Sequence, residues 1–427
     1  MLVSLILEDL ELFLQDKADS GLQIYDIALI LLLFADDMTV FGKSPEDLQH
    51  SLDLMFDYCQ KWGIEVNTSK TKIVVFRKKG RIRPNECWTF NNEVIDNFNY
   101  LGIVFNYNGN FATNNEFLIG KALKAMNTLL YNCKKVPVKP KVLCQLFDSF
   151  VGSILNYACE IWGCTKSKEL ERIHLKFCKR ILKVRLNTST AGVYGELARY
   201  PLYVARYCRI IKYWCKIINT DNIIISKLYT LALEDCNLGR LNWVKQVKQL
   251  LDNYGFSYIF TNGNVCNKTF PSVFKQRVID CYLQDWNELL HKNSVLDEYK
   301  HFKSDFYYEC YLDLVPHNLR SFITKMRLSS HSLRIHTGRY GQNRIPRNER
   351  FCLLCDLHEI EDIYHFAFKC PKYASLRQQY IDSYYFSRPS MYKLVQLFNS
   401  HDKTTLCNVA RFFKLANNLR NGVNFIV

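Results

Sequence analysis

Short apolar runs separated by turn residues dominate the first hundred positions of this 427-residue chain. Residues 27–34 are uninterruptedly apolar, Asp36 and Asp37 follow, and residues 38–41 resume an apolar, β-branched pattern that stops at Gly42. A short apolar run bounded by turn signals favours a buried strand over a helix. The pattern therefore predicts a β-hairpin with two aspartates at its tip.

Helical spacing replaces this pattern in residues 44–62. Ser44 is a typical N-cap residue, and Pro45 suits the first helical position. Apolar side chains then recur at spacings of three and four until Gly63, which predicts one amphipathic helix.

Two further β elements are expected before the chain turns helical. Residues 73–76 are apolar and β-branched, and they predict a strand that leads into a basic stretch at 77–83. Residues 98–105 predict a second hairpin, with Tyr100-Leu101-Gly102 at its edge.

From about residue 115 the pattern is mostly helical. Apolar stripes occupy residues 143–162 and 170–182, and the runs 203–218 and 274–291 are helix-like. His174 lies on one of these stripes, so we expect a histidine of the core or its edge there and not a catalytic one. The expected fold class is α+β, with strands and helices first and a mostly α-helical region after them.

Composition and charge narrow the class of partner. The chain is 48% hydrophobic and 14% aromatic, which is enough for a sizeable core. Its net charge of +15, from 56 Lys and Arg against 41 Asp and Glu, favours phosphate polyanions as partners. Ordinary solubility charge is the alternative interpretation. No apolar run approaches the roughly 20 residues of a membrane span, so we expect no membrane association.

The 17 cysteines are mostly scattered singly in apolar or helical segments, for example Cys59, Cys144, Cys178 and Cys281. The N-terminal residues include Glu8, Asp9 and Glu11 and do not form a basic leader. Scattered cysteines without a secretory signal indicate reduced thiols. The expected location is therefore intracellular, in the cytoplasm, the nucleus or both.

The paired aspartates suggest a metal site. Two adjacent carboxylates repel each other, and Mg²⁺, which prefers carboxylate oxygens and substrate phosphates, removes that penalty. Two such ions about 4 Å apart can activate a primer 3′ oxygen and stabilise the leaving pyrophosphate. Asp36 and Asp37 have the residue type for this chemistry; a solvated acidic turn is the alternative.

The chain resembles a known family at this point. Phe34-Ala35-Asp36-Asp37 resembles the F/Y-x-D-D box of reverse transcriptases. Residues 63–67, followed by Lys70-Thr71-Lys72, look like the next motif of the polymerase palm, and Tyr100-Leu101-Gly102 is similar to the primer-grip turn. Residues 162–202 resemble the thumb and post-thumb region of LINE-type (non-LTR) retroelements.

This resemblance implies roles for the matching residues only. Asp36 and Asp37 would be the catalytic, magnesium-binding carboxylates. Lys70 or Lys72 would lie near the phosphates of the incoming nucleotide, with a solvated lysine as the alternative. Tyr100, Leu101 and Gly102 would hold the primer backbone, with an ordinary β-turn as the alternative.

The chain also departs from the family. In reverse transcriptases an upstream motif supplies a third aspartate and is followed by a nucleotide-binding segment. Only 33 residues precede Phe34 here, and the nearby Asp9, Asp16, Asp19 and Asp26 lack that context. We therefore expect the chain to be catalytically incomplete without a further segment.

A second candidate metal site is Cys352-x2-Cys355-x9-His365-x4-Cys370. Thiolates and an imidazole at such spacings can form a closed tetrahedral zinc site, which is structural and not catalytic. Three buried thiols without a metal are the alternative, and His358 is a rival ligand. The motif resembles the C-terminal CCHC segment of LINE-type proteins.

A basic stretch precedes this cysteine motif and suits RNA or DNA; a solvated basic loop is the alternative. Its candidate nucleic-acid-binding residues are Arg339, Arg344 and Arg347, and Arg334, Arg350 and Tyr340 accompany them.

Together these features predict five regions. They are a partial palm (1–110), a helical thumb-like region (111–200), a helical connector (201–330), a CCHC zinc module (331–375) and a helical tail (376–427). The resemblance implies a fragment of an RNA-directed DNA polymerase that uses an RNA template and a DNA target or primer. The alternatives are a non-catalytic RNA- or DNA-binding remnant and a zinc-stabilised interaction protein.

Overall fold

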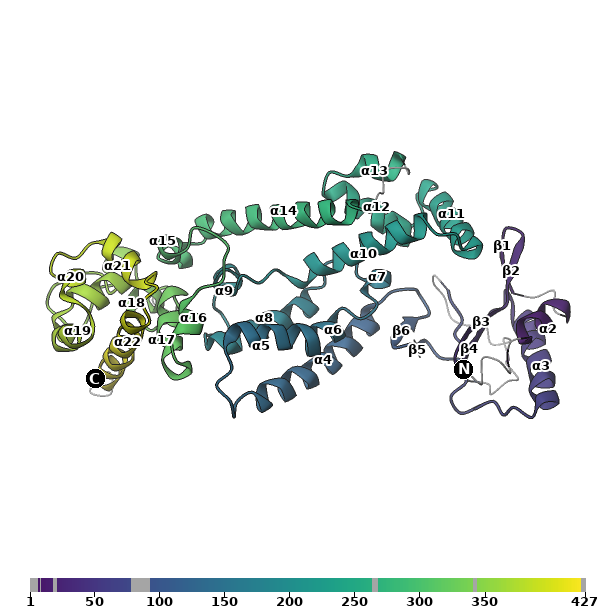
Figure 1. Ribbon diagram of the computed structural model, residues 1–427, viewed down its shortest axis with the longest axis horizontal. Coiled ribbons are helices and arrows are strands. Elements are labelled where there is room, and N and C mark those ends of the chain that lie inside the picture. The colour runs from purple at the N-terminus through teal and green to yellow at the C-terminus, as the bar shows by residue number, and fades with distance from the viewer. Residues whose placement is uncertain are drawn as a thin grey trace. The chain divides into compact units, whose positions relative to one another are not determined.

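The computed structural model describes residue 7 and residues 9–17, 21–77, 93–262, 268–340 and 344–423 (Figure 1). The chain forms two compact units, each built from several segments. The first comprises Met1–Leu118, Ala158–Thr165 and Arg206–Phe274; the second comprises Ile119–Tyr157, Lys166–Ala205 and Lys275–Val427. The five functional regions predicted from the sequence are a different division of the chain and remain a proposal.

Three antiparallel hairpins provide the described β structure of the first unit. They pair β1 (Leu22–Ile24) with β2 (Ile27–Leu29), β3 (Leu31–Phe34) with β4 (Asp37–Val40), and β5 (Asn97–Tyr100) with β6 (Ile103–Asn106). The helical remainder and these small strand pairs are compatible with the expected α+β class.

The apolar run 27–34 differs from the expected single buried strand. It is divided between two hairpins at Ile30, and Leu32, Leu33 and Phe34 are exposed. The hairpin of β3 and β4 is a two-stranded sheet in the described structure. Two strands alone leave apolar side chains in contact with solvent.

The expected helix after Gly42 is confirmed as α3 (Pro45–Trp62). The Ser44 side chain accepts a hydrogen bond from the backbone N–H of Asp47, and Gly63 ends the helix with a φ of 64°. Its buried residues include Leu52, Met55 and Cys59, and it packs against α2 (Leu10–Lys17).

The predicted strand at residues 73–76 is wrong. Among the described residues only Ile73 of this run pairs, in an isolated parallel bridge with Val94. After the run, the backbone N–H of Arg77 donates to the carbonyl of Tyr107 at 2.9 Å. The basic stretch at 78–83 lies outside the described residues.

Helices from the middle of the sequence complete the first unit. They are most of α10 (Leu202–Ile218), α11 (Ile223–Asn237), α12 (Trp243–Asn253) and α13 (Ser257–Asn262). Helix α11 packs against β1. There the Tyr25 hydroxyl donates to Glu234 at 2.7 Å, and Asp26 forms an ion pair with Lys227.

The second unit begins within α4 (Ala112–Asn132) and continues through α5 (Pro140–Phe147). The apolar stripe at 143–162 is helical but interrupted, by the π-helix Asp148–Gly152 and by a break after α6 (Ser153–Leu155). It ends with α7 (Cys159–Trp162), which belongs to the first unit. The second stripe forms α8 (Lys168–Leu182), which ends before α9 (Thr190–Leu197).

His174 is a core residue, as expected. Its ring is fully buried and stacks on Phe147, with ring centroids 5.3 Å apart. Arg199 donates to its Nε2 at 3.2 Å, and the Tyr194 hydroxyl lies 3.3 Å from its Nδ1.

The rest of the second unit is a helical assembly around α22 (Lys403–Val423), which packs against α16 (Tyr311–Leu314), α17 (His317–Arg327) and α19 (Ala374–Tyr380). Further helices of this unit are most of α14 (Phe270–Lys292), α15 (Tyr299–Phe302), α18 (Arg334–Thr337), α20 (Ser383–Phe386) and α21 (Met391–Phe398).

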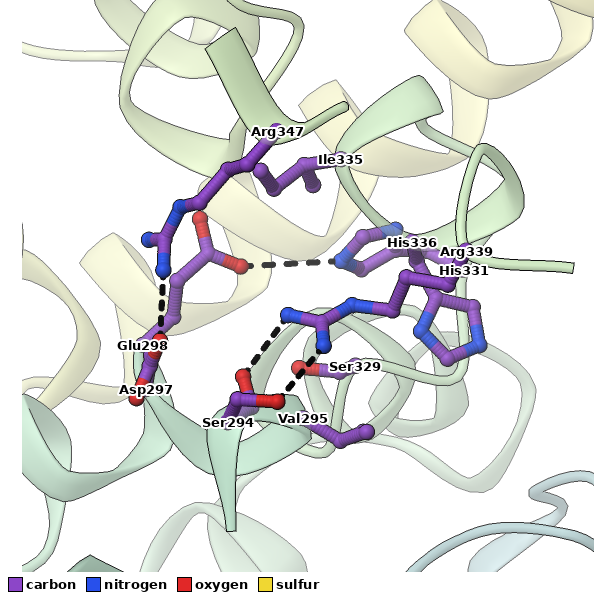
Figure 2. A pocket seen from close by; sticks show the side chains of 10 residues that line it. All are labelled: Ser294, Val295, Asp297, Glu298, Ser329, His331, Ile335, His336, Arg339 and Arg347. Atoms are coloured by element: carbon purple, nitrogen blue, oxygen red, sulfur yellow. Dashed lines mark hydrogen bonds and ion pairs between the residues drawn. The ribbon is translucent and has the colours of Figure 1, made fainter. Parts of the chain in front are cut away.

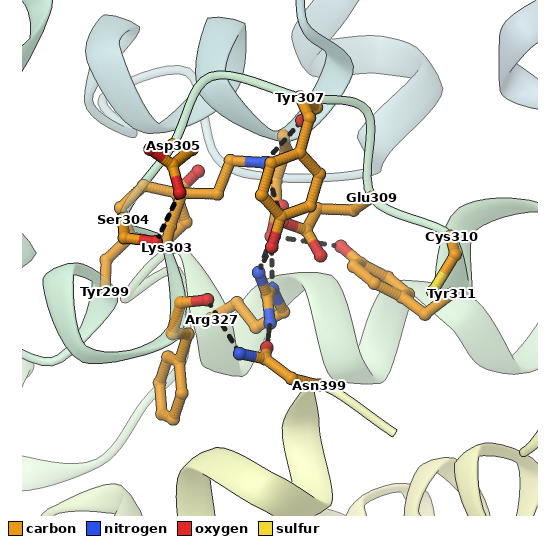
Figure 3. A network of polar contacts seen from close by, with 12 residues as sticks. Tyr299, Lys303, Ser304, Asp305, Tyr307, Glu309, Cys310, Tyr311, Arg327 and Asn399 are labelled. Carbon is orange, nitrogen blue, oxygen red and sulfur yellow. Dashed lines mark hydrogen bonds and ion pairs between the residues drawn. The ribbon is translucent and has the colours of Figure 1, made fainter. Parts of the chain in front are cut away.

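A buried network of charges joins distant segments of the second unit (Figure 3). Arg327, which is completely buried, donates to Glu196 at 2.6 Å and to Glu309 at 3.0 Å. Lys303 donates to Glu309 at 2.7 Å, and Arg327 also donates to the side chain of Asn399 at 2.9 Å. Two carboxylates thus balance two cations, which is the condition for burying charge at acceptable cost.

Cys59, Cys144, Cys178 and Cys281 are free thiols, as expected from the sequence. Cys215 is disulfide-bonded and departs from the expectation of reduced thiols. Across the described residues, no helix combines the length and the apolar character that crossing a membrane requires.

Candidate metal centres and nucleic-acid surface

The two paired aspartates occupy a tight β-turn. Phe34 pairs with Asp37, so Ala35 and Asp36 are the two turn residues. Ala35 has a φ of 55°, a left-handed conformation that costs an alanine roughly 1–2 kcal/mol. Both carboxylates are exposed. The predicted hairpin with an acidic tip is confirmed.

No third acid completes a cluster with this pair within the described structure. Asp9 accepts a hydrogen bond from the Tyr58 hydroxyl, and burial together with this bond raises the pKa of Tyr58 to about 12. Asp26 is ion-paired with Lys227. The side chain of Asp16 and all of Asp19 lie outside the described residues.

The other palm-like residues are distributed as follows. Lys70 is exposed in a turn in which its backbone N–H bonds to Asn67, and Lys72 forms an ion pair with Glu93. Tyr100 pairs with Ile103, so the intervening Leu101 and Gly102 form a two-residue turn with φ values of 48° and 82°. Positive φ at both positions matches the twist of a tight hairpin.

The four predicted zinc ligands converge. The ligand atoms of Cys352, Cys355, His365 and Cys370 all lie within 4.8 Å of one another. His358 is exposed and outside the cluster. Tetrahedral zinc with Zn–S bonds of about 2.3 Å requires ligand atoms roughly 3.5–3.8 Å apart. The Sγ of Cys355 and the Nε2 of His365 are 3.4 Å apart, so the residues present fit a zinc ion.

Local structure holds the ligands in place. An antiparallel bridge between Phe351 and Ile360 closes the segment that carries Cys352 and Cys355. The backbone N–H of Cys352 donates to the carbonyl of Glu359 at 2.9 Å. His365 begins a π-helical turn, His365–Lys369, where its N–H donates to the Asp362 carboxylate at 2.7 Å.

The residue that orients the histidine, Glu359, is not one of the four cysteine and histidine residues of the motif and was not predicted. Glu359 accepts from the His365 Nδ1 at 3.0 Å and from Lys369 at 2.5 Å. With Nδ1 engaged, Nε2 is the nitrogen that faces the thiols. Carboxylates commonly orient metal-binding histidines in this way, so an acid near the motif was the available signal.

Hydrogen bonds within the cluster shift the pKa values of its members. The hydrogen bond between Cys370 and Cys352 lowers the pKa of Cys352 to about 4 and raises the pKa of Cys370. Burial would lower the pKa of His365, but hydrogen bonds with Cys352 and Glu359 outweigh it and raise that pKa. Metal binding would displace the shared protons, because zinc binds thiolates and neutral imidazole.

Two buried arginines connect the cluster to the helices. Arg377 donates to the carbonyl of Cys370 at 2.8 Å. Arg420, near the end of α22, forms a bidentate pair with Glu361 at 2.8 and 2.9 Å. Glu361 also accepts from the backbone N–H of Arg334, so one carboxylate joins three segments.

The arginines predicted to bind nucleic acid have different environments. Arg339 donates to the side chain and carbonyl of Ser294 at 2.9 and 2.7 Å, and Arg347 donates to Asp297 at 2.6 Å (Figure 2). Arg344 is exposed. Burial opposes ionisation of Asp297, yet hydrogen bonds from Arg347 and Lys300 hold its pKa below the usual value.

Arg339 and Arg347 line a small pocket (Figure 2). Its volume of about 10 Å³ suits roughly one water molecule. His331 and His336 line it, with the Nε2 of His331 3.9 Å from Glu298. Burial, with smaller contributions from the charges of His331, Arg185 and Arg339, lowers the pKa of His336 to about 4.

Comparisons with known proteins agree with the sequence motifs. Residues 2–105 match a family described as reverse transcriptase (RNA-dependent DNA polymerase). An uncharacterised transposon-derived protein of Caenorhabditis elegans is 26% identical over 163 residues, which cover 36% of this chain and 57% of that protein. The chain thus spans little more than half of the relative that it matches. Its N-terminal quarter is similar to a reverse transcriptase domain, and the chain is similar to a protein of transposon origin.

Proposed function

We propose that this chain is the C-terminal part of a LINE-type (non-LTR) retrotransposon reverse transcriptase. In the parent protein it would work inside the cell, in the cytoplasm or nucleus, on an RNA template and a DNA primer or target. The observation that supports this most is the turn that presents Asp36 and Asp37 within the segment similar to reverse transcriptases.

In this proposal Asp36 and Asp37 hold Mg²⁺, which activates the primer 3′ oxygen and stabilises the leaving pyrophosphate. Lys70, exposed near the same segment, approaches the phosphates of the nucleotide. Tyr100, Leu101 and Gly102 support the primer. The two aspartates require a third carboxylate, which the described residues do not supply. The chain alone is therefore inactive in DNA synthesis.

Primer extension on an RNA template tests this proposal. The full chain is expected to give no Mg²⁺-dependent product above that of an Asp36→Ala variant. A product that depends on Asp36 would refute the claim of inactivity while supporting the assignment of the aspartates. A complex with a segment that supplies the missing carboxylate is expected to restore synthesis.

The zinc centre favours a second candidate function, a non-catalytic RNA- or DNA-binding remnant. The four ligands and the residues that orient them are intact, whereas the aspartate pair lacks a third acid among the described residues. In this role zinc stabilises the module, and Arg339, Arg344 and Arg347 contact phosphates. The third possibility is a zinc-stabilised protein-interaction module.

Two measurements separate these functions. Metal analysis of the full chain is expected to find one zinc, which is lost in Cys352→Ser and retained in the matched control Cys281→Ser. Binding to single-stranded RNA is expected to weaken steeply as salt rises. Stoichiometric zinc without any salt-dependent RNA or DNA binding would favour the interaction module.

A further inference from the structure

A surface groove in the second unit has no role in the proposed reverse-transcriptase function. It has a volume of about 380 Å³, within the range of about 300–1,000 Å³ that small ligands occupy. The residues that line it are Tyr385, Tyr392, Val395, Gln396, Asn399, Ser400 and His401. It lies on α20 and α21, which contact each other (Figure 1).

One face of α21 forms the main wall. Tyr392, Val395, Gln396 and Asn399 recur at intervals of three, one and three residues, so they share a face of the helix. The buried side chains Leu394, Leu397 and Phe398 hold the opposite face in the core. The Tyr392 ring is 73% exposed. A large aromatic side chain is thus held open to solvent on a fixed helix.

Hydrogen bonds hold the residues at the floor of the groove in place. Asn399 accepts from Arg327 at 2.9 Å and donates to the carbonyl of Phe302 at 3.1 Å. The Ser390 side chain caps α21 by accepting from the backbone N–H of Lys393 at 3.3 Å. A preformed site reduces the entropy lost on binding.

Polar groups remain available at the rim. The Oε1 of Gln396 accepts from the Tyr384 hydroxyl at 3.2 Å, which leaves its Nε2 as a donor. The Nδ1 of His401 lies 3.4 Å from the Sγ of Cys310. With Nδ1 in contact with Cys310, Nε2 is the ring nitrogen of His401 that remains for a ligand. Gln396 and His401 can therefore both form hydrogen bonds with the edge of a planar ligand.

Charge indicates what kind of planar ligand fits. Residues 376–427 contain seven Lys and Arg against two Asp, and no acidic side chain lines the groove. The nearby Asp402 is engaged in capping α22, where its carboxylate accepts from the backbone and hydroxyl of Thr405 at 2.7 Å. Lys393, the neighbour of Tyr392 in the sequence, donates to the carbonyl of Tyr384 and lies 4.4 Å from the centre of the Tyr384 ring.

We infer that this groove binds an unstacked base of a single-stranded nucleic acid, by stacking on Tyr392 and Tyr385 and by hydrogen bonds from Gln396 and His401. Aromatic platforms beside cations suit single strands, because every base has a π face and every linkage carries a phosphate. This inference rests on the proposed nucleic-acid-binding function and adds to it a subsite that binds a base.

The test measures binding of the full chain to fluorescein-labelled single strands by anisotropy. Oligouridylate and oligothymidylate of equal length distinguish RNA from DNA as the source of the base. An abasic DNA strand of the same length keeps the phosphates but removes the stacking partner. Tyr392→Ala is expected to weaken binding to the base-bearing strands at least about fivefold and to leave binding to the abasic strand unchanged.

Two variants serve as controls. Tyr392→Phe keeps the stacking face and is expected to bind as the wild type does. Tyr258→Ala removes a tyrosine that is also exposed but does not line the groove, and it is expected to have no effect.

The outcomes separate this inference from the broader proposal. Salt-dependent binding that is equal in wild type and Tyr392→Ala overturns the base subsite, leaves nucleic-acid binding intact and favours protein docking at the groove. Equal affinity for abasic and base-bearing strands also overturns it. Absence of any RNA or DNA binding overturns both.

Discussion

The buried charge network gives a sharp quantitative prediction. Glu196→Gln preserves the shape of the side chain but removes one of the two negative charges that balance Arg327 and Lys303. Glu196 and Arg327 are both completely buried, so water cannot compensate. Removing one partner of a buried ion pair typically costs about 3–5 kcal/mol. Because glutamine can still accept a hydrogen bond from Arg327, we expect about 3 kcal/mol.

Hydrogen–deuterium exchange is the suitable assay, because a chain of two compact units need not unfold in one step. A loss of about 3 kcal/mol raises the opening equilibrium more than about 100-fold. Faster exchange is expected in α9 and α17, which carry Glu196 and Arg327. The matched control, Glu288→Gln, alters an exposed ion pair with Lys292 and is expected to leave exchange unchanged.

A double variant tests whether the charges act together. The double variant Glu196→Leu/Arg327→Met removes both partners and leaves the Lys303–Glu309 pair neutral overall. We expect its loss of stability to be smaller than the sum of the losses in the single variants Glu196→Leu and Arg327→Met. The reasoning is refuted if Glu196→Gln exchanges as slowly as Glu288→Gln, or if the single effects add.

Three further predictions concern other sites. Glu359→Gln should weaken zinc binding about 10- to 100-fold in competition with a chromophoric chelator, whereas Glu349→Gln should not; equal affinities would dismiss the orienting role. His336 has an ordinary pKa of 6.5 and a folded pKa of about 4, so between these values the unfolded state binds the proton more readily. The free energy of unfolding should therefore decrease as the pH is lowered from about 6.5 to about 4. His336→Phe should flatten that fall in unfolding midpoints between pH 7 and 5, and an unchanged slope would contradict it. Ala35→Gly should relieve the left-handed turn and stabilise the hairpin by about 0.5–1 kcal/mol, seen as slower amide exchange in β3 and β4; faster exchange would count against strain there.

The sequence predicted those features that depend on residues close together in the chain. Ser44 and Gly63 specify both ends of α3, because a side-chain cap and a left-handed residue act within one turn. The acidic tip of the hairpin follows from the change between apolar and charged positions. The four cysteine and histidine ligands follow from spacing and residue type.

Features that depend on distant partners were not predictable. The apolar run 27–34 does not reveal that Ile30 separates two hairpins or that Leu32 and Phe34 are exposed. Residues 73–76 have strand-forming side chains, but a strand also needs a regular partner. Glu196 and Arg327 are 131 positions apart, so no pattern in the sequence pairs them.

The ion pair between Arg420 and Glu361 also bears on how the protein is made. Glu361 lies within the segment that carries the four candidate metal ligands, whereas Arg420 is among the last described residues of α22. During translation the cysteines and histidine leave the ribosome some fifty residues before this arginine does. The four candidate ligands are therefore available before α22, but their segment reaches its final packing only when α22 has been synthesised. A premature stop codon within α22 would release a product that lacks this ion pair and is loosely packed.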